Sequence, residues 1–495
     1  MSKLIIQNGN MCELDLPLKF AQKLYNEFAI RHPNAFYLRT RQRGMQNWDG
    51  KIHYITKTGQ FKIGLLPKVY DMCIEMGIKP KVVDMRQPLP KVSKVVTNIG
   101  KYKLRPEQEK AVKSVINNRV GDTPFHIGVL DLTVNFGKTL IMTSLYLSYK
   151  KQLKTLLITN DSDWLNQARE EFKQYLPGED ITFVQGKVLN WSNFTIGMVQ
   201  SISRNMRFYQ KELSQIDMVL VDEADQGGSK QYQNVITRLF NTRIRIGLSG
   251  TIYMSKLAKD KVKNMNLECF FGKVIAEFKL KDSIKKGYST KTIVKMVPGK
   301  PWYGNWESDC ISYKEIYDDS ITENNTAWTM AYNRLRWNIN QGRYPALVVC
   351  KHIAHCENLY KFFKKKLGDA YNIAYVHVNT PSKLRQQIMN DFREGKIDIL
   401  VSTTIIARGK NFPKLRYLLN AASMDSQEKS IQFLGRLVRT DKSKKKVYLD
   451  DLHYPGPYLD RHGKHRKQYY QRQELKVILL DKLWKKHPNH SLIKS

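Results

Sequence analysis

The stretch LDLTVNFGKTLI, Leu130–Ile141, decides the fold because it joins an apolar run to a segment with helical spacing of apolar residues. Strand, loop and helix in this order are the context of a phosphate-binding loop, G-x-x-x-x-G-K-[ST]. Here Leu132 opens the motif, and Asn135 replaces a glycine of the helicase form. By itself the altered motif leaves two readings open, a nucleotide site and a chance match.

The residues of this loop predict how a triphosphate would be held. Gly137 lets the backbone approach the phosphates, and Lys138 supplies a positive charge near the β and γ phosphates. Thr139 offers its hydroxyl to Mg²⁺. Asn135 is compatible with the loop because asparagine, after glycine, accepts left-handed backbone most readily. The predicted cofactors are therefore ATP and Mg²⁺.

Apolar runs of strand length alternate with helical patterns in two series along the chain, and the loop follows the first run. The first series is FHIGVLDL, TLLIT, FTIGMVQS, DMVLVDEA and IRIGLSGT, and the second is YPALVVC, NIAYVHV, IDILVST, LRYLLNAA and KKVYLD. Continuous apolar runs separated by amphipathic helices predict parallel strands covered on both faces. We therefore predict the α/β class, with two parallel-sheet lobes in tandem behind a small basic α+β domain. The predicted parts are residues 1–95, lobe 1 at 96–280, a connector at 281–340, lobe 2 at 341–455, and a basic helical extension at 456–495.

The charge of the chain predicts a polyanionic partner. Lys and Arg number 82 against 45 Asp and Glu, a net charge of +37 over 495 residues. Such an excess attracts nucleic acid, and a merely solvated surface rarely needs so lopsided a balance. The six cysteines form no CxxC pair, the first residues lack a secretory signal, and no apolar run is long enough to span a bilayer. We expect a cytoplasmic protein, in the host cytoplasm if the chain is viral.

Two further clusters complete the predicted nucleotide site. Asp222 and Glu223 follow the apolar run MVLV, where the first can hold Mg²⁺ and the second can polarise the attacking water. In QFLGRLVR, Arg436 and Arg439 are three residues apart, which on a helix puts them on one face. Nothing in the second lobe resembles another phosphate-binding loop, so we predict that these arginines complete the first lobe's site. ATP would then lie between the lobes.

These elements, in this order, resemble those of superfamily 2 helicases and translocases. Alongside the loop and the arginines, they comprise LRPEQ with Arg105 and Gln108, a literal DEAD from Asp222 to Asp225, Ser249-Gly250-Thr251, and STTIIARGKNFP with Gly409. The resemblance implies two RecA-like lobes, adenine recognition by Gln108, and nucleotide binding by Arg105, Gly409 and Gln432. It also implies coupling through Ser249, Gly250 and Thr251.

Several segments are similar to the phage UvsW-like group of DNA repair and branch-migration helicases. They are FGKVIAEFKLKDSIKKGYST, HVNTPSKLRQQIMNDFREGKIDILVSTTI, YLDRHGKHRKQYY and NWDGKIHYITKTGQFKIGLLPKVYD. The last resembles the small basic DNA-binding domain that precedes the motor in that group. The resemblance implies a DNA partner with branches or single-stranded junctions. Two alternatives stay open: an ATP-dependent RNA helicase, which the literal DEAD favours, and a non-catalytic clamp with a degenerate loop.

Polar residues after the predicted strands are the candidates for holding a nucleic-acid strand, because open α/β sheets bind ligands at that edge. They are Thr159, Asn160, Gln200 and Ser201 in lobe 1, and Lys351, His352, Thr403 and Thr404 in lobe 2. In the N-terminal part, Arg39, Arg41 and Arg43 alternate, so on a strand they would share one face. Phe36 and Trp48 nearby are assigned to the core. Near the C-terminus, Tyr458, His462, Arg466 and Tyr470 recur every four residues and predict one helix face packed on a lobe.

Overall fold

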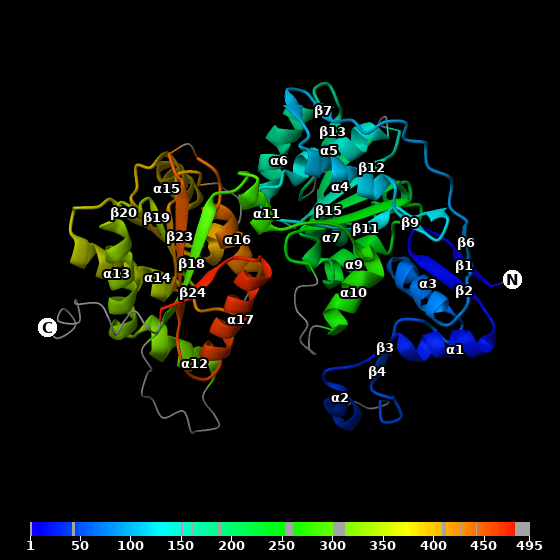
Figure 1. Ribbon diagram of the computed structural model, residues 1–495, viewed down its shortest axis with the longest axis horizontal. Helices are drawn as coiled ribbons and strands as arrows, with labels where there is room; N and C mark the ends of the chain where they lie inside the picture. Colours follow the sequence, from blue (N-terminus) through cyan, green and yellow to red (C-terminus); the bar gives the residue numbers. More distant parts are fainter. Residues whose placement is uncertain are drawn as a thin grey trace. The chain divides into compact units, whose positions relative to one another are not determined.

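The computed structural model describes residues 2–41, 45–149, 152–160, 162–186, 190–252, 261–299, 312–407, 412–425, 427–441 and 443–480. They form two compact units, Met1–Phe278 and Lys279–Ser495, and each is described by itself (Figure 1). No helix in these ranges is long and apolar enough to cross a membrane.

The first unit is built around a sheet of seven strands. In spatial order they are β13 (Ile181–Val184), β14 (Phe194–Met198), β12 (Thr155–Thr159), β15 (Met218–Asp222), β16 (Ile244–Ser249), β11 (Ile127–Leu132) and β17 (Val274–Phe278). Every neighbouring pair is parallel. Helices α4 (Pro106–Ile116), α5 (Lys138–Ser148) and α6 (Ser162–Tyr175) lie on one side, and α7 (Val199–Arg204), α9 (Lys230–Ile236) and α10 (Lys261–Phe271) on the other (Figure 1). The central strands are buried along their whole length because both faces are covered.

The second unit repeats this arrangement. Its strands, in spatial order, are β20 (Ile373–Val376), β21 (Ile399–Thr403), β19 (Ala346–Cys350), β22 (Tyr417–Asn420), β23 (Lys446–His453), β18 (Lys291–Pro298) and β24 (Val477–Leu479). All pairs are parallel. Counted from each sheet's first strand in the chain, the two sheets have the same spatial order. The predicted class, two RecA-like parallel-sheet lobes in tandem, is therefore confirmed.

The second sheet takes strands from both segments that the sequence left outside the lobes. β18 lies in the predicted connector, residues 281–340, together with helices α11 (Leu280–Lys285), α12 (Tyr313–Tyr317) and α13 (Asn325–Ile339). β24 lies in the predicted extension, residues 456–495, after helix α17 (Leu459–Arg472). The remaining helices of the unit are α14 (Ile353–Leu367), α15 (Ser382–Glu394) and α16 (Gln427–Leu437).

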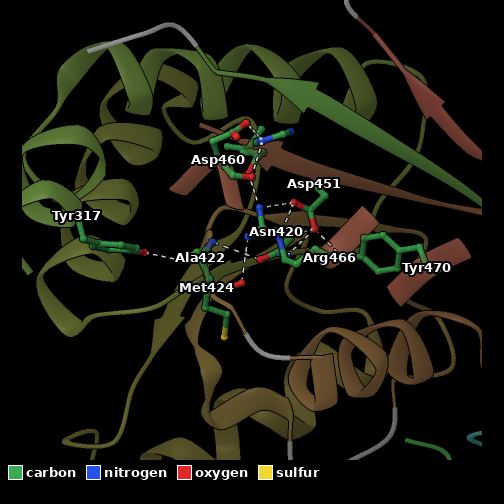
Figure 2. Close-up of polar contacts among 10 residues, drawn as sticks. Tyr317, Asn420, Ala422, Met424, Asp451, Asp460, Arg466 and Tyr470 are labelled. Atoms are coloured by element: carbon green, nitrogen blue, oxygen red, sulfur yellow. Dashed lines mark hydrogen bonds and ion pairs between the residues drawn. The ribbon is translucent and has the colours of Figure 1, made fainter. Parts of the chain in front are cut away.

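Two consecutive buried aspartates on β23 attach helices to opposite faces of this sheet, since successive strand residues point in opposite directions. Asp450 accepts hydrogen bonds from Arg334 of α13, with Nε at 2.9 Å. Asp451 accepts from Arg466 Nε at 2.9 Å and from Tyr470 Oη at 2.7 Å, both on α17 (Figure 2). Ion pairs of this kind explain why α13 and α17 belong to the lobe.

The expected helix face near the C-terminus is confirmed for three of its four residues, whereas Tyr458 is the N-cap of α17 and is 42% exposed. His462, Arg466 and Tyr470 of α17 are buried, and Arg466 is fully so. Besides pairing with Asp451, its guanidinium donates to the carbonyls of Met424 at 3.0 Å and Leu452 at 2.9 Å (Figure 2). Arg466 therefore ties α17 to the loop that precedes α16.

The N-terminal part of the chain packs against the first sheet. It has its own sheet, in the order β5 (Gln60–Lys62), β2 (Met11–Asp15), β1 (Lys3–Ile6) and β6 (Lys81–Asp84), with helices α1 (Leu18–Glu27) and α3 (Leu66–Glu75). Arg245, fully buried on β16, donates to Gly9 O at 2.6 Å and to Asn10 Oδ1 at 2.8 Å. At Gly64, a Cβ would meet Glu268 O at 2.1 Å. These close contacts make the N-terminal part and lobe 1 one compact unit.

Candidate functional site

The phosphate-binding loop has the backbone that its sequence predicted. It connects the end of β11 at Leu132 to the start of α5 at Lys138. Asn135 has φ 67° and Gly137 has φ 82°, both in the left-handed region. The expectation that Asn135 replaces a glycine by adopting this conformation is confirmed. The N-terminus of α5, with its outward-facing N–H groups, follows directly and favours an anion.

Lys138 lies among carboxylates at the carboxyl edge of the first sheet. Its Nζ is 3.6 Å from Asp222 Oδ1 at the end of β15, and the two side chains are only 18% and 6% exposed. Burial opposes the charged form of Lys138, but the attraction of Asp222, Glu223, Asp225 and Asp131 outweighs it and raises the pKa of Lys138. The ammonium group is therefore held charged where phosphates would approach the helix N-terminus.

Asp222 has the character expected of a cation ligand. Its Oδ1 is buried without a hydrogen-bond partner, and burial raises the pKa of this carboxyl although Lys138 opposes the shift. A buried carboxylate oxygen that lacks a hydrogen bond is costly unless a ligand completes it. Oxygen atoms of Asp222 and of the half-buried Thr139 are the ligand type that Mg²⁺ prefers, so these residues fit the ion.

The residues after Asp222 connect the acids to the next strand. Glu223 has φ 54°, an uncommon value for a residue other than glycine, and strain of this kind concentrates at functional sites. Asp225 accepts a hydrogen bond from Ser249 Oγ at 2.8 Å, and that Oγ accepts one from Thr251 N at 3.1 Å. The predicted coupling residues are thus bonded to the acidic motif. Gly250 lies close to the loop, since a Cβ there would be 2.9 Å from Leu132 O.

Gln108 and Arg105 contact the loop itself. Gln108 Nε2 donates to Phe136 O at 2.6 Å, and Arg105 donates to the same carbonyl. Gln108 Oε1 accepts from Arg105 N at 2.8 Å, at the N-terminus of α4. A Cβ on Gly137 would lie 2.5 Å from Gln108 Nε2. The amide that the sequence assigns to adenine is therefore also a support for the phosphate-binding loop.

The predicted nucleic-acid-binding residues of lobe 1 differ in their contacts and in their burial. Asn160 Nδ2 donates to Gln226 Oε1, and Gln200 Nε2 donates to Asn160 O at 3.4 Å, so the carboxyl ends of β12 and β14 meet the residue after the acidic motif. Ser201 Oγ accepts from Gly186 N at 2.9 Å. Thr159 is fully buried, so its side chain offers no surface to a nucleic acid in this structure.

In lobe 2 the prediction of one helix face for the two arginines is wrong. Arg436 lies in the last turn of α16, but the helix ends at Leu437, so Arg439 lies beyond it. The reason is that other groups take the carbonyls at this end. Lys444 Nζ donates to Leu437 O at 3.0 Å, and Thr290 N donates to Val438 O at 2.9 Å. Gln432 is half-buried on α16.

The remaining predicted residues of lobe 2 lie at the carboxyl edge of its sheet or outside the description. Thr403 ends β21 and is buried, whereas Thr404 Oγ1 accepts from Lys429 Nζ of α16 at 3.2 Å. The Lys351 ammonium lies 4.0 Å and 4.8 Å from the ring centroids of Tyr313 and Tyr317. His352 is the N-cap of α14. Gly409 lies outside the described residues.

The predicted strand of alternating arginines is wrong, because Arg39 and Arg41 lie on helix α2 (Ala35–Arg41). Their spacing therefore does not place them on one face. Arg43 lies outside the described residues. Phe36, assigned to the core from the sequence, is instead 80% exposed, while Trp48 is half-buried. The charged side chains are exposed as expected, but the aromatic ones are partly exposed as well.

Sequence reasoning missed residues that support the site through other residues. Asp131 is buried at the end of β11 and acts on Lys138, and Lys429 joins α16 to the end of β21. Asp131 is a charged residue inside an apolar run, which was a usable signal. Lys429 is a single cation in a polar helix and carries no such signal.

Two family profiles match the chain in the order of its two lobes. Residues 101–254 match the family described as type III restriction enzyme, res subunit. Residues 331–441 match the helicase conserved C-terminal domain. Fold, site and profiles together define a helicase with two RecA-like lobes. The chain belongs to superfamily 2 of the helicases.

The chain is similar to a viral protein and to a phage protein of solved structure. "Putative helicase 22" of a Sulfolobus islandicus filamentous virus is 22% identical over 385 residues, which are 71% of this chain and 64% of that protein. The chain thus spans less than two thirds of this relative. T4 UvsW is 19% identical, covering 97% of this chain and 98% of its own, with a TM-score of 0.45.

Two further solved structures share the fold at low identity. LlaBIII, an ATP-dependent type ISP restriction-modification enzyme bound to DNA, is 14% identical, with a TM-score of 0.57 over 83% of this chain and 34% of that one. Dbp5 of S. cerevisiae, bound to RNA and ADP BeF3, is 13% identical, with a TM-score of 0.52 over 78% of this chain and 92% of that one. The shared fold therefore occurs with both kinds of nucleic acid.

Proposed function

We propose that this chain is an ATP- and Mg²⁺-dependent DNA helicase or translocase that remodels branched DNA, such as forks and Holliday junctions. The observation that carries the ATPase proposal is the Lys138–Asp222 pair at 3.6 Å, beside a loop with left-handed Asn135 and Gly137. Lysine, buried acid and helix N-terminus are the parts from which a phosphoryl-transfer site is made.

Each residue has a separate task in the proposed reaction. Lys138 and the N–H groups at the start of α5 bind the β and γ phosphates, and Thr139 with Asp222 would hold the ion. Mg²⁺, when bound, neutralises charge on the phosphate oxygens. Glu223 orients the attacking water and accepts its proton.

We infer that the arginines of the second unit complete this site. Arg436 and Arg439 carry planar guanidinium groups that can stabilise the charge developing on the transferred phosphoryl group. The order of the two family profiles supports this role, since lobe 1 carries the phosphate-binding loop and lobe 2 the arginines. The bonds from Ser249 to Asp225 and to Thr251 would transmit the state of the acids to the rest of lobe 1.

A DNA partner is supported by charge and by resemblance. The net charge of +37 favours a polyanion, and LlaBIII bound to DNA is among the solved structures that share the fold. The choice of branched DNA comes from the UvsW-like segments of the sequence. An RNA substrate is the second candidate, because the literal DEAD and the structure of Dbp5 bound to RNA favour it.

The deciding experiment measures ATP hydrolysis across a panel of nucleic acids: single-stranded RNA, single-stranded DNA, duplex, fork and four-way junction. We expect the junctions to stimulate hydrolysis most. Stimulation by RNA alone would contradict the DNA proposal.

The same assay tests whether the chain is a clamp rather than a motor. Lys138→Ala and Glu223→Gln should each lower kcat by roughly a hundredfold or more. Absence of hydrolysis by the unmodified chain, or no loss in either variant, would favour a clamp.

A further inference from the structure

One part of the N-terminal domain contains β3 (Ala29–Arg31), α2 and β4 (Lys51–His53) and is here named the α2 tip. The two strands pair antiparallel, and α2 lies beyond them (Figure 1). His32 N donates to Gly50 O at 2.8 Å, and Trp48 Nε1 donates to Lys51 O at 2.9 Å. The buried Ala35 packs against Gly50, because a Cβ added at Gly50 would lie 3.2 Å from the Cβ of Ala35. The α2 tip is therefore an ordered element with internal contacts.

Large aromatic side chains of the α2 tip point outward despite this order. Phe36 is 80% exposed and Tyr37 is 56% exposed, whereas Ala35 is the residue of α2 that is buried. Two adjacent exposed aromatic rings on an ordered element lose the stabilisation that burial would provide. Such a patch, rimmed by polar groups, usually marks an interaction surface.

The rim of this patch is basic. Arg31, Arg39, Arg41 and Lys51 are all exposed, and the Arg41 guanidinium lies 5.1 Å from the centroid of the Tyr37 ring. Arg31 stands directly opposite Lys51 in the strand register, an arrangement of like charges that destabilises a strand pair.

Among the described residues of the α2 tip, Asp49 is the one acid, and it is bonded to His53 at 2.7 Å. The surface therefore favours an anionic partner.

We propose that the α2 tip binds unpaired bases where a DNA duplex ends, with Phe36 and Tyr37 stacking on the bases and the arginines holding the flanking phosphates. This proposal rests on the proposed function and specifies which DNA structure the chain would bind, namely the end of a duplex with unpaired bases. A nucleic acid offers both flat apolar faces and regular negative charge, which matches a pair of exposed rings inside a basic rim. An apolar protein partner would leave four cations unpaired, and an acidic one would leave the rings without a partner.

The test compares binding of a forked DNA with binding of a fully paired duplex. The fork carries 2-aminopurine at its first unpaired position, whose fluorescence reports stacking. We expect the Phe36→Ala, Tyr37→Ala double variant to bind the fork roughly tenfold or more weakly and to lose the fluorescence change, because stacked bases lose about that much on alanine substitution. Duplex binding should change little.

Two controls sharpen this expectation. Leu18→Ala removes an equally exposed side chain, 80% exposed, from α1 of the same domain, and should leave fork binding unchanged. Arg39→Ala should weaken fork and duplex alike and reduce the salt dependence of binding by about one counterion.

The outcomes separate the inference from the proposed function. A chain that neither binds the fork nor hydrolyses ATP faster with DNA would overturn the proposed function. Normal DNA-stimulated hydrolysis with equal fork binding by the double variant would overturn the inference alone. A third outcome is that the double variant loses self-association, measured by sedimentation, while its fork binding is unchanged. This result would assign the α2 tip to a protein contact and would also overturn the inference.

Discussion

The two sheets have the same strand order but use buried charge differently. In the first sheet, Asp222 Oδ1 is buried without a hydrogen bond and lies 3.6 Å from Lys138. In the second, Asp451 accepts from Arg466, Asn420 and Tyr470, all within 3.1 Å (Figure 2). At the edge beside Lys138, the unbonded oxygen of Asp222 is open to a ligand, whereas the carboxylate of Asp451, bonded through both oxygens, is a structural connection.

Two buried lysines show the same contrast. Lys138 has several carboxylates around it, and their attraction outweighs burial and raises its pKa. Lys444 donates to the carbonyls of Leu415 and Leu437, and burial, only partly opposed by Asp441, lowers its pKa to about 8. The first lysine is suited to a phosphate, and the second terminates a helix.

The largest expected effect tests the incomplete pairing of Asp222. Asp222→Asn should lower kcat for ATP by roughly a hundred- to a thousandfold, because a neutral amide is a poor ligand for Mg²⁺ and metal assistance is worth several kcal/mol. Its free energy of unfolding should fall by less than the roughly 3–5 kcal/mol typical of a broken buried pair, because Glu223, Asp225 and Asp131 still attract Lys138. Steady-state kinetics and urea unfolding measure both quantities. Strong destabilisation with a normal kcat would show that Asp222 is a structural residue and not a ligand for Mg²⁺.

The complementary change is made in the second unit, on helix α17. Arg466→Leu leaves Asp451 buried and without its cation, which should cost roughly 3–5 kcal/mol of stability. Urea unfolding followed through the second unit measures this cost, and Gln468→Leu, exposed on the same helix, is the control. Adding Asp451→Leu to Arg466→Leu should recover part of the loss. A loss below about 1 kcal/mol would show that α17 is held by other contacts.

A smaller effect is expected at Asn135. Asn135→Gly keeps access to φ near 67° and should change the KM for ATP by less than about twofold. Asn135→Ala disfavours this backbone by roughly 1–2 kcal/mol and should raise the KM several-fold with little change in kcat. Equal KM values for both variants would show that the left-handed conformation is not needed for nucleotide binding.

The smallest effect, taken per pH unit, is a pH dependence from Lys444. Its folded pKa of about 8 lies below the ordinary value of 10.5, so between these pH values the unfolded chain binds more protons. Stability of the second unit should therefore rise with pH from about 8 toward 10.5, by at most about 1.4 kcal/mol per pH unit. Lys444→Met should remove this rise in urea unfolding at pH 8, 9 and 10. If the stability of the Lys444→Met variant rises with pH as much as that of the parent, the rise belongs to other titratable groups.

Local motifs were predictable because their chemistry is contained in adjacent residues. The apolar runs gave ten of the strands, and the loop from Leu132 to Thr139 gave the strand, turn and helix with its left-handed asparagine. The same reasoning failed for β13, β17, β18 and β24. The last two show why. β18 alternates between buried and partly exposed positions, and β24 is three residues long, so neither has a continuous apolar run.

Helix ends and surface exposure were also not predictable from spacing. The spacing of Arg436 and Arg439 suggested one helix face, but Lys444 and Thr290 bind the last carbonyls and end the helix between them. Phe36 is a residue type that usually lies in a core. In the α2 tip, however, Ala35 and Trp48 make the internal contacts, and the ring of Phe36 is exposed.

The sequence by itself determined the α/β class, the superfamily and the chemistry of the loop, since these depend on periodicity and on neighbouring residue types. Only the tertiary structure decided which charges face each other. Asp450 and Asp451 are adjacent in the chain, yet each finds its arginine more than a dozen residues away and on opposite faces of the sheet. Pairing across such separations depends on packing of the whole unit, which no local pattern encodes.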